Sequence, residues 1–387
     1  MSLLLLLLAS LATSQAEIGC VLDILAKAPN APLVVNSSFQ YPTPISIHNT
    51  QIYFSQGEFF YIACPNGTSN YPIVGSGEVA ICHHNSTIST LSSDLVVDFH
   101  EIECRQETRP NVLHYNTDTL CEHNFRLHNM DNVVFGTNLT SISMCFDYHY
   151  YVPLYSKYTT NQWLDNNPSY DPNVTFFNPS EVFQGKNLLE YEKTVKERME
   201  NLGFGDYITD NVTLILGHLA DPSEFLTSFE RDLTFDTSNA VFRWNTIDQG
   251  NWKKIRLAMQ ELITHGGDYG DVIMLTGALN VATLVGKKLF LDTLFKAIPV
   301  PQWIWKLMYS KTTKFGIIFF VYNNPWNKKS QADSEFESVC ENVFDSLNWV
   351  DRIDNEDAFA GYTYACTLDR NQIFDDTIDK IVQNVLK

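Results

Sequence analysis

Short runs of alternating hydrophobic and polar residues, separated by Gly, Pro and Asn, fill the first part of the chain. The clearest of these runs are Ile45-Ser-Ile-His, Ile52-Tyr-Phe and Glu58-Phe-Phe-Tyr-Ile. Such a pattern is typical of short strands in an antiparallel sheet, so it predicts a β-rich domain over residues 17–150. Residues 151–185 contain turn signals such as Asn166-Asn167-Pro168 and are predicted to be loop-like.

A helical period replaces this alternation in the second half of the chain. The hydrophobic residues between Leu188 and Leu202 fall on one helix face, and Gly203 can end that helix. A second hydrophobic stripe begins near Asn251, and Gly266-Gly267 ends it. Strands are predicted over residues 212–218, 303–307 and 316–322.

The N-terminus has the pattern of a secretory signal peptide. A run of leucines from Leu3 to Leu8 is followed by small residues, and Ser14 and Ala16 suit the positions before a cleavage site. We therefore expect residues 1–16 to be removed. No other stretch approaches the roughly 18 apolar residues of a membrane-spanning helix, so the mature protein is expected to be soluble, secreted and extracellular.

The chain contains 8 cysteines, an even number that in a secreted protein predicts four disulfides with about 105 possible pairings. No Cys-x-x-Cys pair occurs, which disfavours a zinc site. The cysteines crowd into the first 145 residues, and two more follow near the C-terminus. This distribution predicts a disulfide-stapled domain over residues 17–150 and a larger domain over 151–375, closed by the last two. The full set is Cys20, Cys64, Cys82, Cys104, Cys121, Cys145, Cys340 and Cys366.

Asn-x-Ser/Thr sequons and an acidic composition accompany these export signals. The sequons are candidate glycosylation sites on surface loops. The formal net charge of −19 favours solubility, and it would repel a polyanion at long range. Any contact with nucleic acid must therefore rest on a small local basic patch. The sequons lie at Asn36, Asn66, Asn85, Asn138, Asn173 and Asn211.

Two stretches carry the candidate chemistry: Leu214-Ile-Leu-Gly-His-Leu-Ala, and the segment from Thr234-Phe to Ile247-Asp-Gln-Gly-Asn-Trp. They closely resemble motifs of secreted arthropod nucleases that degrade double-stranded RNA and DNA. These nucleases belong to the DNA/RNA non-specific endonuclease family, together with the Serratia nuclease and endonuclease G. Gly361-Tyr-Thr-Tyr-Ala-Cys366 and several shorter pieces extend the resemblance over roughly residues 18–370.

The resemblance implies an α+β protein with a ββα-metal endonuclease fold, preceded by the disulfide-stapled β-rich domain. In this family a His at the end of a strand acts as general base on a water. One Mg²⁺ (or Mn²⁺), held by an Asn and by waters, neutralises the phosphate. An Arg beside the His and a Glu on the following helix complete the site. DNA and double-stranded RNA are the implied partners.

Matched residue by residue, the resemblance gives a catalytic His218 and a metal-binding Asp248, and it places Asn239 at a further conserved position. The family's Arg falls on Leu216 and its Glu on Arg256. An Asp in place of Asn can still bind Mg²⁺. Loss of the Arg can cost about 3–4 kcal/mol in transition-state stabilisation.

The Glu-to-Arg change repels a metal, unless Arg256 supplies charge from the other side or pairs with Asp248. A second arginine, which the family carries upstream, is also absent, since none lies between Arg126 and Arg198. The resemblance therefore implies a degraded active site.

Structural alternatives accompany these assignments. Asp248 precedes a helix and could cap it. Lys253, Lys254 and Arg256 could bind substrate phosphates or form a solvated helix face. Asn239 could bind substrate or hold the local structure.

Three functions remain open. The first is Mg²⁺-dependent hydrolysis of nucleic acid with activity that is weak or lost. The second is an inactive pseudonuclease that binds nucleic acid, and the third is a structural secreted glycoprotein.

Overall fold

The computed structural model describes residues 19–24, 30–42, 44–45, 50–64, 67–69, 77–106, 113–121, 125–162, 177–337 and 339–368. The chain divides into two compact units. Unit 1 comprises residues 1–45 and 50–105, and unit 2 comprises 46–49 and 106–387. This division lies well before residue 150, where the sequence places the domain boundary. The difference arises because the strands between residues 113 and 147 pair into the large sheet of unit 2.

Unit 1 is built almost entirely of short strands. Its main sheet has five antiparallel strands in the order β2-β4-β6-β7-β8, and β1 pairs with β3 in a separate two-stranded sheet. A short 3-10 turn (Phe99–Glu101) follows β8. The strand bounds are β1 Gly19–Asp23, β2 Leu33–Val35, β3 Gln51–Ser55, β4 Phe59–Ala63, β5 Gly67–Ser69, β6 Gly77–His84, β7 Thr87–Thr90, β8 Ser93–Asp98 and β9 Cys104–Gln106.

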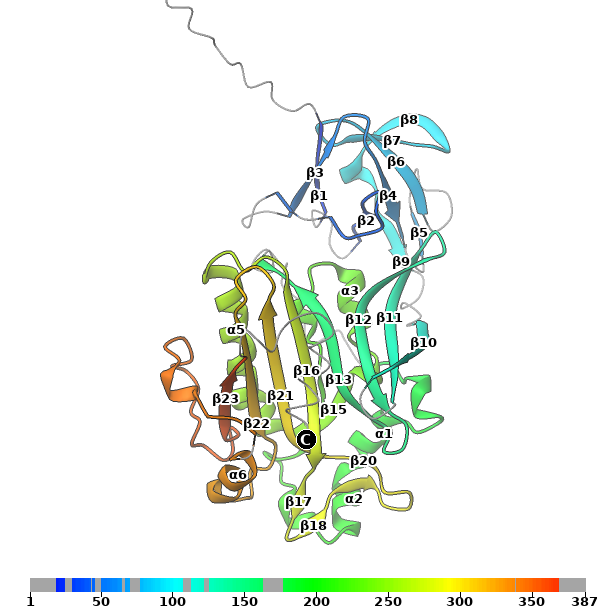
Figure 1. Cartoon of the computed structure of the whole chain (residues 1–387). Coiled ribbons are helices and arrows are strands. Elements are labelled where there is room, and N and C mark those ends of the chain that lie inside the picture. The colour runs from blue at the N-terminus through cyan, green and yellow to red at the C-terminus, as the bar shows by residue number, and fades with distance from the viewer. Residues whose placement is uncertain are drawn as a thin grey trace, which may run out of the picture. The chain divides into compact units, whose positions relative to one another are not determined.

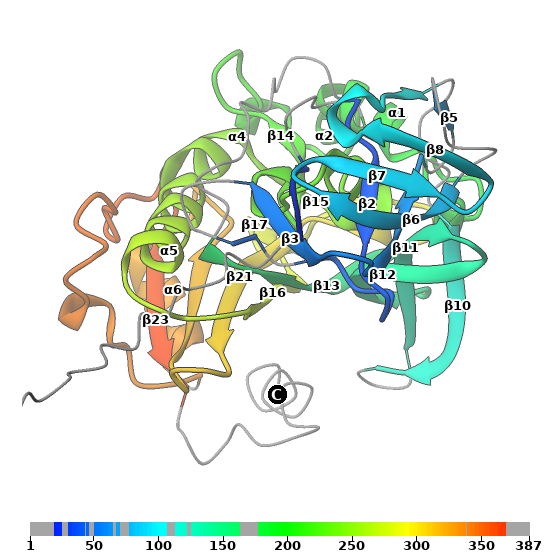
Figure 2. The same ribbon diagram turned by 90° about the horizontal axis from the view of Figure 1, so that it is seen from above.

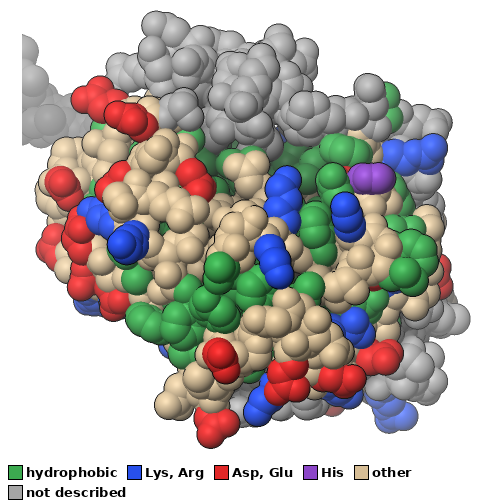
Figure 3. All heavy atoms as spheres, turned by 90° about the horizontal axis from the view of Figure 1, so that it is seen from below, with side chains coloured by type: hydrophobic (Ala, Val, Ile, Leu, Met, Phe, Trp, Pro, Cys, Tyr) green, Lys and Arg blue, Asp and Glu red, His purple; other side chains and the backbone are tan. Residues whose placement is uncertain are grey.

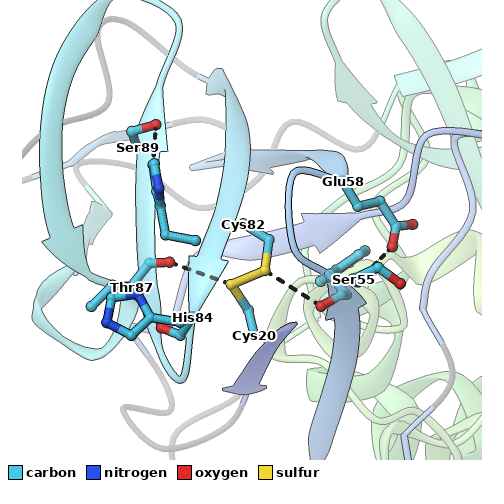
Figure 4. Close-up of a disulfide and its surroundings, with 9 residues drawn as sticks. Cys20, Ser55, Glu58, Cys82, His84, Thr87 and Ser89 are labelled. Atoms are coloured by element: carbon cyan, nitrogen blue, oxygen red, sulfur yellow. Dashed lines mark hydrogen bonds between the residues drawn. A yellow bond between two sulfur atoms is a disulfide. The ribbon is translucent and has the colours of Figure 1, made fainter. Parts of the chain in front are cut away.

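Two disulfides hold unit 1 together, Cys20–Cys82 and Cys64–Cys104. Figure 4 shows the first of these joining β1 to β6, with the sulfur of Cys20 lying 3.3 Å from the carbonyl oxygen of Thr87. A small domain gains much of its stability from such cross-links because its hydrophobic core is limited. The other two disulfides, Cys121–Cys145 and Cys340–Cys366, lie in unit 2. The predicted Cys340–Cys366 pair is thus confirmed.

An eight-stranded antiparallel sheet in the order β10-β11-β12-β13-β16-β21-β22-β23 forms the centre of unit 2 (Figure 1). Smaller pairs, β14-β15, β17-β18 and β19-β20, accompany it. The strand bounds are β10 Leu113–Leu120, β11 Arg126–Val134, β12 Thr137–Asp147, β13 Val152–Thr160, β14 Leu214–His218, β15 Ala240–Trp244, β16 Val272–Val281, β17 Thr283–Leu284, β18 Lys287–Lys288, β19 Phe290–Asp292, β20 Ala297–Pro299, β21 Pro301–Ser310, β22 Gly316–Tyr322 and β23 Thr363–Thr367.

Helices cover the two faces of this sheet unequally. Figure 2 shows α4, α5 and the β14-β15 pair on the same side of the sheet, and residues of α1 and α2 join the same core cluster. Helix α6 packs on the opposite face. The helices are α1 Leu188–Lys193, α2 Val195–Asn201, α3 Ser228–Leu233, α4 Asn245–Ile247, the π-helical η8 Asp248–Trp252, α5 Lys253–His265 and α6 Lys329–Phe336, with 3-10 turns η4 Glu181–Phe183, η5 Gly205–Tyr207, η6 Pro222–Glu224, η7 Thr237–Asn239 and η9 Phe344–Ser346.

Most elements predicted in the second half of the chain are confirmed. The strands β14, β21 and β22 and the helix α5 form where the pattern places them, and Gly266 follows α5 as its C-terminal cap. The helix predicted from Leu188 is divided into α1 and α2 at Thr194. The prediction of a loop over residues 151–185 is wrong for β13, a strand in the middle of the large sheet.

Candidate active site

The antiparallel pair β14-β15, followed by α4, η8 and α5, forms the ββα unit that carries the candidate site. Strand β14 ends at His218, which pairs with Ala240 on β15. Gly217 precedes it, and a Cβ atom at this position would overlap the guanidinium of Arg243. Only glycine therefore lets the Arg243 side chain lie across β14 beside His218.

Arg243 is the first buried cation of the site. Its side chain is 2% exposed, and its Nε atom lies 2.7 Å from Oδ1 of Asp248. Its Nη1 atom donates a hydrogen bond of 3.2 Å to the carbonyl oxygen of His218. The guanidinium thus connects the end of β14 to the start of the helical segment. The other carboxylate oxygen of Asp248, Oδ2, accepts a hydrogen bond of 2.6 Å from Gln249 Nε2.

A second ion pair joins Arg256 on α5 to Asp221, which lies just after β14. Asp221 also caps the turn η6, since its Oδ1 accepts hydrogen bonds from the Ser223 backbone N–H at 3.0 Å and the Ser223 hydroxyl at 2.6 Å. Burial favours the protonated form of Asp221, but the Arg256 charge and these bonds together hold its pKa well below the usual range. The pKa of Arg256 is raised: burial opposes the shift, but the attraction of Asp221 and Asp248 outweighs it.

His218 lies between two aromatic rings. Its ring centroid is 4.3 Å from that of Phe177 and 4.8 Å from that of Phe235. Its Nε2 atom is shielded from solvent and has no hydrogen-bond partner among the described residues. Burial, with some help from the Arg243 and Arg256 charges, lowers the pKa of His218 from 6.5 to about 4. The imidazole is consequently neutral at physiological pH, which is the state a general base requires.

A third ion pair lies beneath the η6 turn, on the large sheet. Lys306 of β21 is fully buried, and its Nζ lies 2.8 Å from Oε1 of Glu224. Tyr158 donates a 2.5 Å hydrogen bond to Oε2 of the same carboxylate. The same Oε2 atom accepts the backbone N–H of Asp221 at 3.2 Å. Lys306 and Glu224 therefore fix the turn that presents Asp221 to Arg256.

The structure brings several predicted residues together and reassigns others. His218, Asp248 and Arg256 act on one another electrostatically. Arg256 pairs with Asp221 and Asp248 with Arg243, so the alternative of an Arg256–Asp248 pair is wrong. The capping alternative for Asp248 is also wrong, because α5 is preceded by Trp252 and has no side-chain cap.

Asn239 is fully buried, and its amide has partners on both sides. Its Oδ1 accepts hydrogen bonds of 2.9 Å from Ser156 and from the Ala220 backbone. Its Nδ2 donates to the carbonyl oxygens of Ala220 at 2.8 Å and Thr234 at 3.0 Å. This arrangement leaves no amide group for a substrate and favours the structural alternative.

We call His218 and the pairs Arg243–Asp248 and Arg256–Asp221 the charged cluster. The remaining predicted positions lie in apolar or solvent-exposed surroundings. Leu216 is 6% exposed and packs in the hydrophobic core, rather than standing in a polar cleft. Lys253 is exposed and Lys254 half-buried, both in the first turn of α5, which holds no acidic residue. Of the sequons, Asn85, Asn138 and Asn211 are exposed and Asn36 is half-buried, while Asn66 and Asn173 lie outside the described residues.

The residues of this site do not fit the family's Mg²⁺. Both oxygens of Asp248 already have partners, and guanidinium groups rather than carboxylates surround it. Mg²⁺ requires octahedral coordination by oxygen atoms and is repelled by neighbouring cations.

A separate cavity of about 520 Å³ opens elsewhere in unit 2. Its lining includes Leu154, Leu279 and Glu335, and none of the predicted site residues. Leu154 and Leu279 pack with the cluster on the α6 side of the sheet. This cavity is therefore distinct from the His218 cluster.

Sequence reasoning missed Arg243 and Asp221. The resemblance places the site's arginines at position 216 and upstream of β14, whereas Arg243 comes from the neighbouring strand. One signal was available: Ala240-Val-Phe-Arg-Trp places a single cation in an apolar strand whose residues are all buried, which predicts a buried ion pair. No pattern links Asp221 to Arg256, 35 positions later.

A ββα unit whose first strand ends in a histidine is the arrangement expected of a ββα-metal nuclease. Comparison with known proteins supports the same class. The family model of the DNA/RNA non-specific endonuclease matches residues 116–371. The chain belongs to this family, and membership supports hydrolysis of nucleic acid as the class of reaction. Family members are in general metal-dependent.

Two relatives are named as salivary proteins. A salivary endonuclease of Lutzomyia longipalpis is 22% identical over 363 residues, which is 90% of this chain and 85% of the relative. Salivary protein Tsal1 of Glossina morsitans morsitans is 25% identical over 234 residues, covering 58% of this chain and 57% of the relative. A crystal structure of the EndoG/EndoGI complex aligns with 57% of this chain and 88% of its own, at 15% identity and a TM-score of 0.37, too distant to bear on the fold.

Proposed function

We propose that this protein is a secreted nucleic-acid-binding member of the family whose phosphodiester hydrolysis is weak or lost. The observation that carries the proposal is the state of Asp248. Its carboxylate lies at the family's metal position, yet it is held by Arg243 at 2.7 Å and by Gln249 at 2.6 Å. Catalysis in this family depends on neutralising phosphate charge with a metal. A site whose candidate ligand is already paired binds that metal poorly.

His218 argues for retained binding or residual chemistry rather than for a purely structural protein. It is kept neutral at the end of β14, with a ring nitrogen that has no partner among the described residues. DNA and double-stranded RNA are the proposed ligands, in keeping with the name of the family.

Secretion is part of the proposal. The four disulfides, which use all eight cysteines, fit an extracellular protein, and two relatives are named as salivary proteins. We propose that residues 1–16 are the signal peptide and that the exposed sequons carry glycans. In the described part of the chain no helix has the length and hydropathy of a membrane span.

The test is to compare binding with cleavage on protein exported from eukaryotic cells. Gel-shift titrations with double-stranded RNA and DNA measure binding. Plasmid and RNA cleavage, with Mg²⁺ and separately with Mn²⁺, measures hydrolysis. The expected result is binding of both duplexes with little or no cleavage, and any cleavage should disappear in His218→Ala. Rapid metal-dependent cleavage that needs His218 would establish the active-enzyme alternative, while failure to bind either duplex would leave the structural glycoprotein.

A further inference from the structure

We propose that Arg256 replaces the divalent cation as the phosphate-contacting charge, so that nucleic acid binds this site without metal. This inference rests on the proposed nucleic-acid binding and adds the group that performs it. It reverses the family's arrangement, in which a metal lies between protein oxygens and the phosphate.

The hydrogen-bonding capacity of Arg256 is only partly used. A guanidinium has five N–H donors in a planar fork that matches two phosphate oxygens. Here Nη1 is bonded to Asp221 Oδ2, whereas Nε is buried without a hydrogen-bond partner in the described part of the chain. His218 Nε2 is in the same condition. Buried polar atoms without partners are rare in folded proteins. Because the Arg256 side chain is 17% exposed, a small movement of its guanidinium brings these donors to an incoming phosphate oxygen.

Local charge favours an anion. The charges that act on His218 balance, because the cations Arg243 and Arg256 are matched by the carboxylates Asp221 and Asp248. Lys253 and Lys254 precede Arg256 in the first turn of α5, which holds no acidic residue. These lysines add two positive charges at the start of the helix that carries Arg256, in a protein whose total charge is −19. Because distant charges are screened beyond about 10 Å at moderate salt, this local excess can bind phosphate. On the face shown in Figure 3, basic side chains are scattered, some of them beside acidic ones, and form no continuous band.

Asp221 is the competitor that tunes this site. In the free protein it neutralises Arg256, and a phosphate must share or displace that contact. Its replacement by Asn keeps the oxygen that caps the η6 turn through Ser223 but removes the charge that competes with phosphate. Asp221→Asn is therefore expected to strengthen nucleic-acid binding, whereas a purely structural role for the pair would predict weaker binding.

The experiment measures the fluorescence anisotropy of a labelled short duplex, RNA or DNA, in EDTA and in Mg²⁺. Wild-type protein should bind equally well or better in EDTA. Arg256→Gln should weaken binding about ten- to a hundredfold, since it removes a charge-assisted hydrogen bond. It should also lower the slope of log affinity against log salt by about one. Asp221→Asn should bind about tenfold more tightly, and Arg256→Lys should recover only part of the affinity because it lacks the fork.

Two controls separate a loss of binding from a loss of folding. Thermal melts identify any variant that no longer folds, and the uncharged double variant Asp221→Asn with Arg256→Gln avoids leaving one charge unpaired. That double variant should bind as weakly as Arg256→Gln. Binding that requires Mg²⁺ would overturn the inference but leave the proposed function standing, as would unchanged affinity in Asp221→Asn and Arg256→Gln. Absence of binding under every condition would instead remove the proposed function itself.

Discussion

The two faces of strand β21 differ in chemistry although both are buried. On one face, Trp303, Trp305 and Tyr309 pack against α6 and the neighbouring strands in an aromatic cluster. On the other face, Lys306 stands between Ile304 and Met308 and pairs with Glu224. We refer to these as the aromatic face and the charged face. Every residue of the strand is buried, so the degree of burial does not distinguish the two faces.

The difference shows where the fold contains buried ion pairs, which add little to the free energy of unfolding. A buried ion pair is costly to desolvate, and a hydrophobic pair of similar volume is often as stable or more so. The aromatic face uses the hydrophobic solution. The charged face holds the Lys306–Glu224 pair. Two further pairs of the same unit, Arg256–Asp221 and Arg243–Asp248, act on His218. The predictions below test whether these pairs serve the site or only the fold.

Lys306→Met gives the largest expected effect. Removing the cation leaves Glu224 charged and buried, which should lower the free energy of unfolding by about 3–5 kcal/mol. The matched control is Leu307→Met, which puts the same side chain at the next position, on the aromatic face, and should cost less than about 1.5 kcal/mol. Urea denaturation measures both. Adding Glu224→Gln to Lys306→Met should recover part of the stability; equal costs for the two Met variants would erase the distinction between the faces.

The pH dependence of stability gives the next effect. The pKa of His218 is about 4 in the folded protein and 6.5 ordinarily, so between these values the unfolded chain binds more protons. Stability should therefore fall as pH drops from about 6.5 to 4, by about 1.4 kcal/mol per unit from this group. His218→Gln should lack this component. Glu192 and Glu230, whose pKa burial raises, act in the opposite direction in both proteins, so the difference between wild type and variant isolates His218. A difference that does not vary with pH would contradict a neutral imidazole with a lowered pKa.

The sequence predicts the aromatic face better than the charged one. Continuous or alternating apolar runs locate β21 and β22, because both strands are buried on two sides. Strand β13 was missed because it contains Pro153, Ser156, Lys157 and consecutive threonines, which lack a strand-like hydrophobic pattern. Its polar residues are explained only by long-range partners, such as the Ser156 hydroxyl bonded to Asn239.

The candidate site was also only partly predictable from the sequence. Motif resemblance located His218 and Asp248, since strand and helix keep them at a fixed spacing in the chain. It could not supply their electrostatic partners. Arg243 reaches the site because Gly217 leaves room for it across the strand pair, and Asp221 pairs with Arg256 through the turn fixed by Lys306 and Glu224. These relations depend on folding and not on local pattern.

Two glycine substitutions sharpen the comparison at smaller energies. A Cβ atom at Gly217 would meet the Arg243 guanidinium, and one at Gly277 would meet the Trp305 ring. Either change to Ala should lower the free energy of unfolding by about 1–3 kcal/mol through overpacking. Only Gly217→Ala should also weaken nucleic-acid binding, because it displaces a cation of the charged cluster. Anisotropy and urea denaturation on both variants provide the test, and equally weakened binding in Gly277→Ala would point to a general loss of structure.

The smallest effect on stability is expected from the lysines at the start of α5. Lys253 is exposed and Lys254 half-buried, so Lys253→Gln with Lys254→Gln should change the free energy of unfolding by no more than about 0.5 kcal/mol. Nucleic-acid affinity should nevertheless fall, and the slope of log affinity against log salt should decrease by up to about two, one for each phosphate that a lysine no longer neutralises. The matched control replaces the exposed Lys287 and Lys288 of β18 with Gln, which changes the net charge by the same amount at a different place. If binding depends on the positive charge at the start of α5, only the α5 variant should bind more weakly. If both variants are weakened equally, total charge governs binding, and the ion pairs Arg256–Asp221 and Arg243–Asp248 would have to be regarded as structural features.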